Sequence, residues 1–315
     1  MRLFVLTLLI LNILTFYYLF DKIDNNNMQL IELKEITIEK DDKKNEDTFD
    51  DIFSRVDITN LNRYIYLNEH SEYYDNILDK LIYKLVDNPS DIVYDNLKGI
   101  LLFYLSGNDF NIYNGIKLKD KILYTLALQN AIMEIESGGC FNYDLFVMSP
   151  TKAFGRFQIN GSTLGYIIWR EILKSSIDLN MFKDFETKKY LWSDIKDYCS
   201  KINRDYLIND LITYSRRFNK SLSQHISCGS DLKRKIFMTI LYQYRKPFIQ
   251  SYLSLIVLKT KESIAKKYVD NYRDMLQKTV ELYNGSKKRV KRGMYYKEVY
   301  ANKVYNKYID NLNSM

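Results

Sequence analysis

The sequence predicts a mostly α-helical fold, and three observations support this prediction. Apolar residues recur at intervals of three and four over several long stretches, as on one face of an amphipathic helix. The 3 prolines and 11 glycines in 315 residues are too few for the many turns of a β-sandwich. No stretch shows a convincing alternation of apolar and polar residues. With 46% hydrophobic and 27% charged residues, the chain is long enough and apolar enough to form a core.

The first element is an uncharged apolar stretch over residues 3–20, with Arg2 before it and Asp21 after it. A helix of this length spans roughly 27 Å, close to the thickness of the hydrocarbon core of a bilayer. The stretch is longer than the apolar part of a cleaved signal peptide and has no small-residue cleavage site. We therefore expect residues 1–20 to be a single-pass transmembrane anchor in the cell inner membrane, with the rest exported to the periplasm. A cleaved signal and a buried terminal helix are the alternatives.

A charged linker is expected over residues 21–52. Of its thirty-two residues, eleven are acidic and five are basic, a composition typical of a solvated tether. The whole chain is at +7, and the linker and Arg2 together hold −5, so residues 53–315 hold +12. This excess favours an anionic polymer as partner, although a solubilising surface explains it equally well. Because the chain has no recognised nucleic-acid-binding motif, we expect no nucleic acid partner.

Helices are expected to fill the rest of the chain. Ser71 stands as an N-cap before apolar positions that end at Leu85, and Pro89 and Ser90 separate this helix from the next. That second helix ends at Ser106-Gly107, where glycine can take the left-handed conformation. The same apolar spacing predicts further helices over residues 119–136, 264–284 and 295–308.

The domain organisation is less clear from the sequence. Gly107, Asn108 and Gly115 indicate a boundary near residue 115. It would separate a small helical region over residues 53–115 from a domain over residues 116–315. The stretch over residues 164–247 mixes short apolar runs with charge and shows no strong boundary signal.

The residues that indicate chemistry lie between Ala131 and Thr163. Glu136 ends a helical pattern and is followed by Ser137-Gly138-Gly139. A carboxyl group in the last turn meets the negative end of the helix dipole, so its pKa is expected to be raised. A raised pKa suits a general acid, and glycines leave room for a polymer to approach.

Taken in order, these motifs resemble the catalytic domain of lytic transglycosylases (SLT-like), the goose-lysozyme-like members of the lysozyme superfamily that cut bacterial peptidoglycan. The resemblance covers residues 120–308. The family pattern is a helix ending in Glu-Ser-Gly, a Ser, an Ala-x-Gly-x-x-Gln-Ile block, a Ser/Thr pair, a Tyr-Asn-Gly and a Tyr-x-x-x-Val helix. The matching blocks are Glu136-Ser137-Gly138, Ser149, Ala153 to Ile159, Ser162-Thr163, Tyr283-Asn284-Gly285 and Tyr300 to Val304.

The resemblance implies a lysozyme-like enzyme that acts on peptidoglycan glycan strands without a cofactor. Glu136 would be the single acid/base that cleaves the MurNAc-GlcNAc β-1,4 bond and leaves a 1,6-anhydro-MurNAc end. Tyr283 would lie beside Glu136 and orient it. The substrate contacts would be Ser137, Gln158, Tyr283, Asn284 and Arg156.

Two other functions stay open. A hydrolytic muramidase would need a second carboxylate. Glu134 lies about 200° around the helix from Glu136 and faces elsewhere, which leaves Asp144 as the candidate, or as a solvated loop residue. The domain could instead be a non-catalytic peptidoglycan-binding scaffold of an envelope-spanning machine, but such a scaffold has no need of an acid at Glu136.

The sequence departs from the family pattern at Arg156-Phe157, and its cysteines and histidines indicate no further site. Arg156-Phe157 replaces the Leu-Met pair that the family usually has, so Arg156 binds either a substrate carboxylate or an internal acid. The three cysteines, Cys140, Cys199 and Cys228, show no disulfide framework. With only two histidines in the chain, we expect no metal site.

Overall fold

The computed structural model describes residues 47–137, 153–174, 182, 206–224, 229–269, 271–284 and 295–315. Residues 47–315 form one compact unit, in which the described residues make eleven α-helices, a short 3-10 turn and one two-stranded hairpin. Because 77% of the described residues are helical, the predicted mostly α-helical fold is confirmed. The anchor expected over residues 1–20 lies outside the described residues.

The described chain begins with α2 (Phe49–Ser54), a short helix inside the range expected for the linker. Thr48 and Asp51 form a capping box: the Thr48 hydroxyl accepts from the Asp51 amide at 3.2 Å, and the Asp51 carboxylate accepts from the Thr48 amide at 3.1 Å. The Phe49 ring is fully buried in the core. The folded unit therefore begins before residue 53, where the linker was expected to end.

Three helices follow α2, and two of them match the predicted ones. They are α3 (Leu61–Leu67), α4 (Ser71–Leu85) and α5 (Asp91–Leu105). Ser90 caps α5 as predicted, since its hydroxyl accepts from the Val93 amide at 3.4 Å, and Gly107 follows the helix with a φ of 72°. Ser71 is the first residue of α4 rather than its cap, because His70 holds the cap position with a φ of 55°.

Helix α6 (Leu118–Ser137) agrees with the helix expected over residues 119–136. After it, β1 (Ala153–Phe154) pairs antiparallel with β2 (Ile159–Asn160). No strand was predicted here, because two residues per strand are too few to show an alternating pattern. The mostly helical fold thus includes one small hairpin, and this hairpin carries the Gln158 motif.

Three helices occupy the stretch that was hardest to read in the sequence: α7 (Gly161–Lys174), α9 (Tyr206–Ser223) and α10 (Ser230–Tyr244). Helix α7 packs along α9. The buried residues of α9 recur at helical spacing, at Leu211, Tyr214, Phe218 and Leu222. This stretch is therefore part of the packed helical unit.

The last three helices correct one prediction. They are α11 (Pro247–Ala265), α12 (Tyr272–Asn284) and α14 (Tyr295–Asn313). The single helix expected through Ile264 and Val280 is two helices, because the chain turns after α11 and Asn271 caps α12 by accepting from the Asp274 amide at 2.9 Å. Helix α12 ends at Asn284 as predicted, and α14 continues past its predicted end at residue 308.

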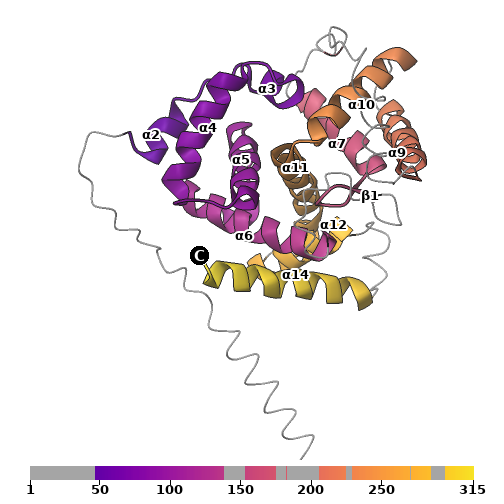
Figure 1. Cartoon of the computed structure of the whole chain (residues 1–315). Coiled ribbons are helices and arrows are strands. Elements are labelled where there is room, and N and C mark those ends of the chain that lie inside the picture. The colour runs from indigo at the N-terminus through magenta and orange to yellow at the C-terminus, as the bar shows by residue number, and fades with distance from the viewer. Residues whose placement is uncertain are drawn as a thin grey trace, which may run out of the picture. The chain divides into compact units, whose positions relative to one another are not determined.

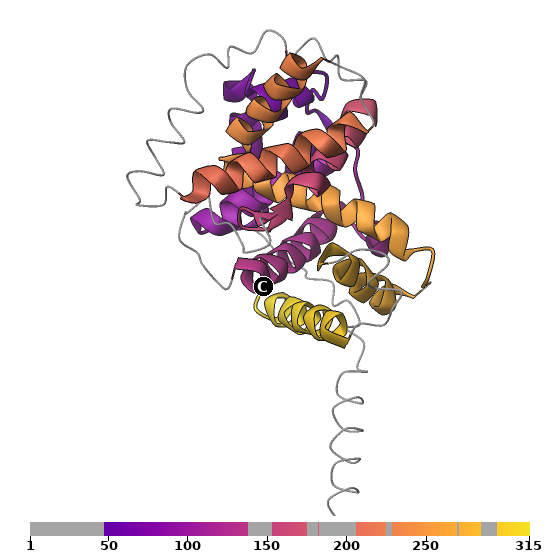
Figure 2. The same cartoon turned by 90° about the vertical axis from the view of Figure 1, so that its right-hand side faces the viewer.

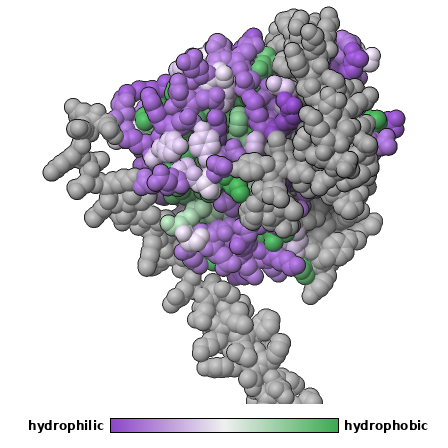
Figure 3. Space-filling model, in the orientation of Figure 1, coloured by the Kyte–Doolittle hydropathy of each residue, from purple (hydrophilic) through white to green (hydrophobic). Residues whose placement is uncertain are grey.

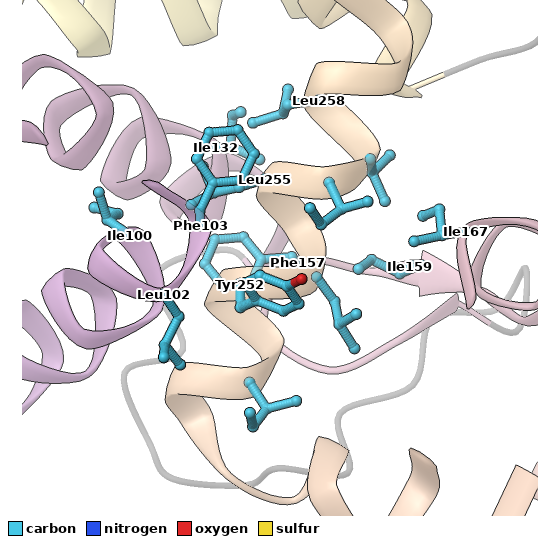
Figure 4. Close-up of a cluster of buried hydrophobic side chains, with 14 of the residues drawn as sticks. Ile100, Leu102, Phe103, Ile132, Phe157, Ile159, Ile167, Tyr252, Leu255 and Leu258 are labelled. Atoms are coloured by element: carbon cyan, nitrogen blue, oxygen red, sulfur yellow. The ribbon is translucent and has the colours of Figure 1, made fainter. Parts of the chain in front are cut away.

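Helix α11 is the centre of the core. Figure 1 shows it between α5 and α6 on one side and α7 and the hairpin on the other, while Figure 2 shows the same helices from the side. Every residue from Ile249 to Leu258 is buried, as expected for a helix surrounded on all faces. In the close-up of Figure 4, Tyr252 and Leu255 of α11 lie among Phe103 of α5, Ile132 of α6 and Phe157 of the hairpin.

Helices α5 and α11 approach most closely at Gly99. A Cβ atom there would lie 2.3 Å from Ser251 Oγ and 2.6 Å from the Phe248 carbonyl oxygen. The buried Ser251 hydroxyl donates to the Asn96 carbonyl at 3.1 Å, and Gln129 of α6 donates to the Ser251 carbonyl at 2.8 Å. The Ser251 hydroxyl and carbonyl and the Asn96 carbonyl are thereby satisfied, as burial requires.

The expected boundary near residue 115 does not divide this packing. Helices α5 and α6 lie on either side of it in the chain and contact each other. The buried Glu262 carboxylate accepts from the Ile112 amide at 2.9 Å and from the Asn111 side chain at 3.2 Å, so it binds the turn before residue 115 to α11. We therefore describe residues 47–315 as one unit rather than two.

The surface of this unit is mainly polar on the face shown in Figure 3, where apolar residues are scattered among hydrophilic ones. The large apolar side chains that are exposed among the described residues are Ile58, Tyr73, Tyr83, Tyr268 and Met315. Within the described ranges, we find no helix with the length and hydropathy that a membrane span requires.

Gly99→Ala is expected to lower the free energy of unfolding by about 1–3 kcal/mol, because the added methyl group must separate α5 from α11. Gly229→Ala is the matched control, since nothing lies within 4 Å of a Cβ atom at that position. Its effect should stay below about 1 kcal/mol. Urea denaturation of both variants measures the difference. Equal stability of the two variants would contradict the close packing of α5 on α11.

Candidate active site

Glu136 lies in the last turn of α6, where its carboxylate meets a tyrosine from the last helix of the chain. The Tyr300 hydroxyl of α14 donates to Glu136 Oε1 at 2.6 Å. Helices α6 and α14 pack side by side in Figures 1 and 2. The hydrogen bond fixes one carboxylate oxygen.

The packing of α6 on α14 holds Tyr300 in place. The two helices run antiparallel, because Lys307 pairs with Glu134 at 2.9 Å and Asn311 donates to the Ala127 carbonyl at 3.2 Å. Glu134 is therefore paired with Lys307 of α14, the same helix that supplies Tyr300 to Glu136. This leaves Glu136 as the acidic side chain that Tyr300 holds.

The pKa of Glu136 is raised above its ordinary value of 4.5. Burial is the larger cause, because it penalises the charged carboxylate. The Tyr300 hydrogen bond acts in the opposite direction, since it stabilises that charge. A raised pKa was expected from the sequence, and it favours the protonated form that a general acid needs.

The hairpin turn brings Gln158 into a strained conformation. Gly155 has a φ of 77° and Gln158 a φ of 49°, which is uncommon for a residue with a side chain. The Gln158 amide donates to the Gly155 carbonyl at 3.1 Å, and its side-chain Nε2 donates to the same oxygen at 2.7 Å. These two bonds stabilise the turn around Gln158.

Tyrosines from three helices, two of them fully buried, hold the backbone of the hairpin. Tyr244 of α10 donates to the Phe154 carbonyl at 2.8 Å, and Tyr214 of α9 donates to the Ile159 carbonyl at 3.1 Å. Tyr283 of α12 donates to the Phe157 carbonyl at 2.7 Å. Such bonds are needed because buried carbonyl groups without a partner are costly, and this sheet supplies few partners.

A fourth contact comes from Gln250 of the central helix α11. Its Oε1 accepts from the Arg156 amide at 2.8 Å, and its Nε2 donates to the Tyr244 carbonyl at 2.9 Å. A Cβ atom at Gly155 would lie 2.5 Å from Gln250 Oε1 and 2.9 Å from the Tyr244 ring. Glycine is therefore required here both for its positive φ and for the close approach.

Tyr283 corrects the predicted role of this residue. It was expected to orient Glu136, but its hydroxyl donates to the hairpin, and Tyr300 holds the carboxylate instead. Tyr283 does lie close enough for the charge of Glu136 to help burial raise its pKa well above the ordinary value. Tyr283 therefore binds the backbone next to Gln158, feels the charge of Glu136, and stays a neutral hydrogen-bond donor.

Arg156 corrects a second prediction. Its side chain is only 4% exposed, and Nη1 lies 3.7 Å from Asp95 Oδ2 of α5. Of the two partners considered for Arg156, the structure shows the internal acid. A buried guanidinium cannot reach a glycan without leaving this position.

Some predicted residues fall outside what the structure describes. Ser137 and Asn284 end α6 and α12, but their side chains are not among the described ones. Asp144 and the three cysteines also lie outside the described residues. Of the predicted site residues, the structure thus brings together Glu136, Tyr283 and the Gln158 turn.

Several residues of the site were missed by sequence reasoning. Tyr300 begins the Tyr-x-x-x-Val block and was given no role, although its place in that block was a usable signal. Tyr214, Tyr244, Gln250 and Asp95 gave no signal, because each contacts the hairpin across at least 55 residues of chain.

The arrangement can supply one proton donor. Among the described residues, no second carboxylate shifts the pKa of Glu136. No group of three His, Cys, Asp or Glu side chains in the same ranges could hold a metal ion. The chemistry that this geometry offers is acid/base catalysis by a single carboxyl group.

Glu136→Gln is expected to stabilise the protein at neutral pH. Because the folded-state pKa is raised, folding opposes ionisation, and stability is lost as pH rises from the unfolded toward the folded pKa. Glutamine removes this loss and can still accept from Tyr300. The gain should therefore be present at pH 8 and vanish near pH 4, as measured by urea denaturation.

Glu134→Gln is the control for this comparison, because Glu134 pairs with Lys307 at the surface. It should give no gain at pH 8. A Glu136→Gln variant that is less stable than the wild type at pH 8 would contradict the burial of an ionisable Glu136.

Comparisons of the chain with known proteins found no relative. No protein-family model, no curated protein and no solved structure matches the chain. The assignment of a function therefore depends on the site residues and their arrangement.

Proposed function

We propose that the chain is a peptidoglycan lytic transglycosylase with a lysozyme-like catalytic domain and Glu136 as its acid/base. The observation that carries the proposal is the position of Glu136 at a helix end, half-buried, with a raised pKa and a hydrogen bond from Tyr300. The adjoining Gln158 turn and the Tyr283 contact stand in the order in which the family has these motifs.

In the proposed reaction, protonated Glu136 gives its proton to the glycosidic oxygen between MurNAc and GlcNAc. The carboxylate then takes the proton of the C6 hydroxyl of MurNAc while that oxygen bonds to C1. The products are a GlcNAc hydroxyl end and a 1,6-anhydro-MurNAc end, and no water is consumed. Tyr300 stabilises the carboxylate that exists between the two proton transfers.

A single carboxyl group favours this reaction over hydrolysis. Inverting and retaining glycosidases use two carboxyl groups, one as acid and one as base or nucleophile. Burial and Tyr300 account for the pKa of Glu136, without a second acid among the described residues. In a hydrolytic muramidase, Asp144 would supply the missing base.

The proposed glycan contacts are the Ser137 and Asn284 side chains and the turn around Gln158, whose own side chain donates to the Gly155 carbonyl. Arg156 is left out because its guanidinium is buried against Asp95. The partner is the peptidoglycan glycan strand, and no cofactor is required.

The proposed location follows from residues 3–20. An anchor in the inner membrane would export the catalytic unit to the periplasm, where peptidoglycan lies. The +12 charge of residues 53–315 suits an anionic polymer.

The test is digestion of purified peptidoglycan by the full chain in detergent, followed by mass spectrometry of the soluble products. We expect muropeptides that are lighter by one water than the reducing forms. Glu136→Gln should slow their release about 10²–10⁴-fold, because it removes the general acid. Glu134→Gln, which changes a neighbouring carboxylate in the same way, should release them at a rate close to the wild type.

Other products would contradict the proposal in distinct ways. Muropeptides with reducing ends would identify a hydrolase. No release by folded wild-type protein, together with binding to peptidoglycan, would identify a non-catalytic scaffold of envelope machinery.

A further inference from the structure

The ion pair between Asp95 and Arg156 joins two parts of the chain that the sequence analysis separated. Asp95 belongs to α5, in the helical region before residue 115, and Arg156 belongs to the hairpin turn. The Asp95 side chain is 17% exposed and the Arg156 side chain 4% exposed, with 3.7 Å between Oδ2 and Nη1.

The buried guanidinium needs this carboxylate. An arginine cannot lose its charge in a protein, so burial must be offset by an opposite charge and hydrogen bonds. Removal of one partner from a buried pair leaves the other charge uncompensated, which is a large cost. The side chain of Arg156 is therefore constrained to stay against α5.

This constraint acts two residues from Gln158. The Arg156 amide is held by Gln250 of α11, while its side chain is held by Asp95 of α5. Gln158 has a φ of 49°, and such strained conformations persist only where the surroundings hold them. The two anchors on Arg156 supply such support from one side of the turn.

The charge of Asp95 is itself sensitive to its surroundings. It feels Arg156 from the turn and Lys98 and Asp91 from its own helix, and Lys98 also pairs with Asp75 at 2.7 Å. Burial raises the pKa of Asp95 to about 6, although both cations act to lower it. The ion pair is therefore complete above this pH and loses its negative partner below it.

We infer that Asp95 is a positioning residue for the candidate active site: through Arg156, it holds the Gln158 turn, whose Phe157 carbonyl accepts from Tyr283 near Glu136. Asp95 touches no substrate and acts only on the turn. The inference rests on the proposed function and extends it, because it makes α5 part of the catalytic apparatus.

The test measures kcat and KM of the full chain in detergent between pH 4.5 and 8, on soluble peptidoglycan glycan chains. Asp95→Asn should lower kcat about 10- to 100-fold at pH 8, with a smaller change in KM, because the turn loses its alignment. The wild type should lose activity as pH falls through about 6, as Asp95 is protonated. Asp95→Asn should lack this loss.

Two more variants separate positioning from folding. Asp95→Glu keeps the carboxylate and should restore most of kcat, and Asp91→Asn changes an exposed acid one turn earlier in α5 and should leave kcat unchanged. If Asp95→Asn unfolds, the double variant Asp95→Asn/Arg156→Met leaves no buried charge unpaired. It should fold, by its melting temperature, and still show the lower kcat.

The outcomes distinguish the inference from the function on which it rests. Cleavage by folded Asp95→Asn or by the double variant with wild-type kcat and pH profile would overturn the inference alone. A lower melting temperature with unchanged kcat would do the same, since it would show a merely structural role. No cleavage by the wild type at any pH would overturn the proposed function and the inference with it.

Discussion

The structure around the candidate site depends on how a very short hairpin satisfies its buried backbone. Each strand has only two paired residues, so most backbone groups of the turn find no partner in the sheet. Side chains of four helices supply these partners: Tyr214, Tyr244 and Tyr283 donate to carbonyl oxygens, and Gln250 accepts from an amide. Because every one of these groups is attached to a packed helix, the hairpin is held by the helical unit rather than by its own pairing. These bonds use three of the 28 tyrosines of the chain.

The same arrangement explains how the acid and the turn come together. Glu136 is carried by α6 and held by Tyr300 of α14, while Tyr283 of α12 lies near that carboxylate and binds the backbone beside Gln158. Glu136 and Tyr283 thus lie close to the hairpin, on helices α6 and α12 that are far apart in the sequence. Burial of Glu136 opposes its ionisation, so the raised pKa that the proposed general acid needs is unfavourable for stability at neutral pH.

Much of the fold could be predicted from the sequence where the signals are local. The periodic apolar faces predicted α4, α5 and α6 nearly to the residue, although Ser71 begins α4 instead of capping it, and the motifs named Glu136 and Gln158 without predicting a turn. Features that depend on tertiary contacts could not be predicted from local sequence patterns. The apolar spacing through Ile264 and Val280 continued across a turn, because spacing alone does not show where a helix ends. The partner of Arg156 is Asp95, 61 residues earlier, and the tyrosine bonds to the hairpin join residues 55 to 126 positions apart. Only the packed core determines such pairs.

The central claim is that hydrogen bonds from the packed helices, and not its own strand pairing, hold the hairpin in place. Residue-resolved hydrogen exchange of the native protein tests it directly, with the Arg156 amide as the reporter, because Gln250 accepts from it in the core. The account predicts that this amide exchanges as slowly as the amides of the buried turns of α11, through global unfolding. Exchange at the rate of an exposed loop, while α11 stays protected, would show that the hairpin opens by itself and would contradict the account.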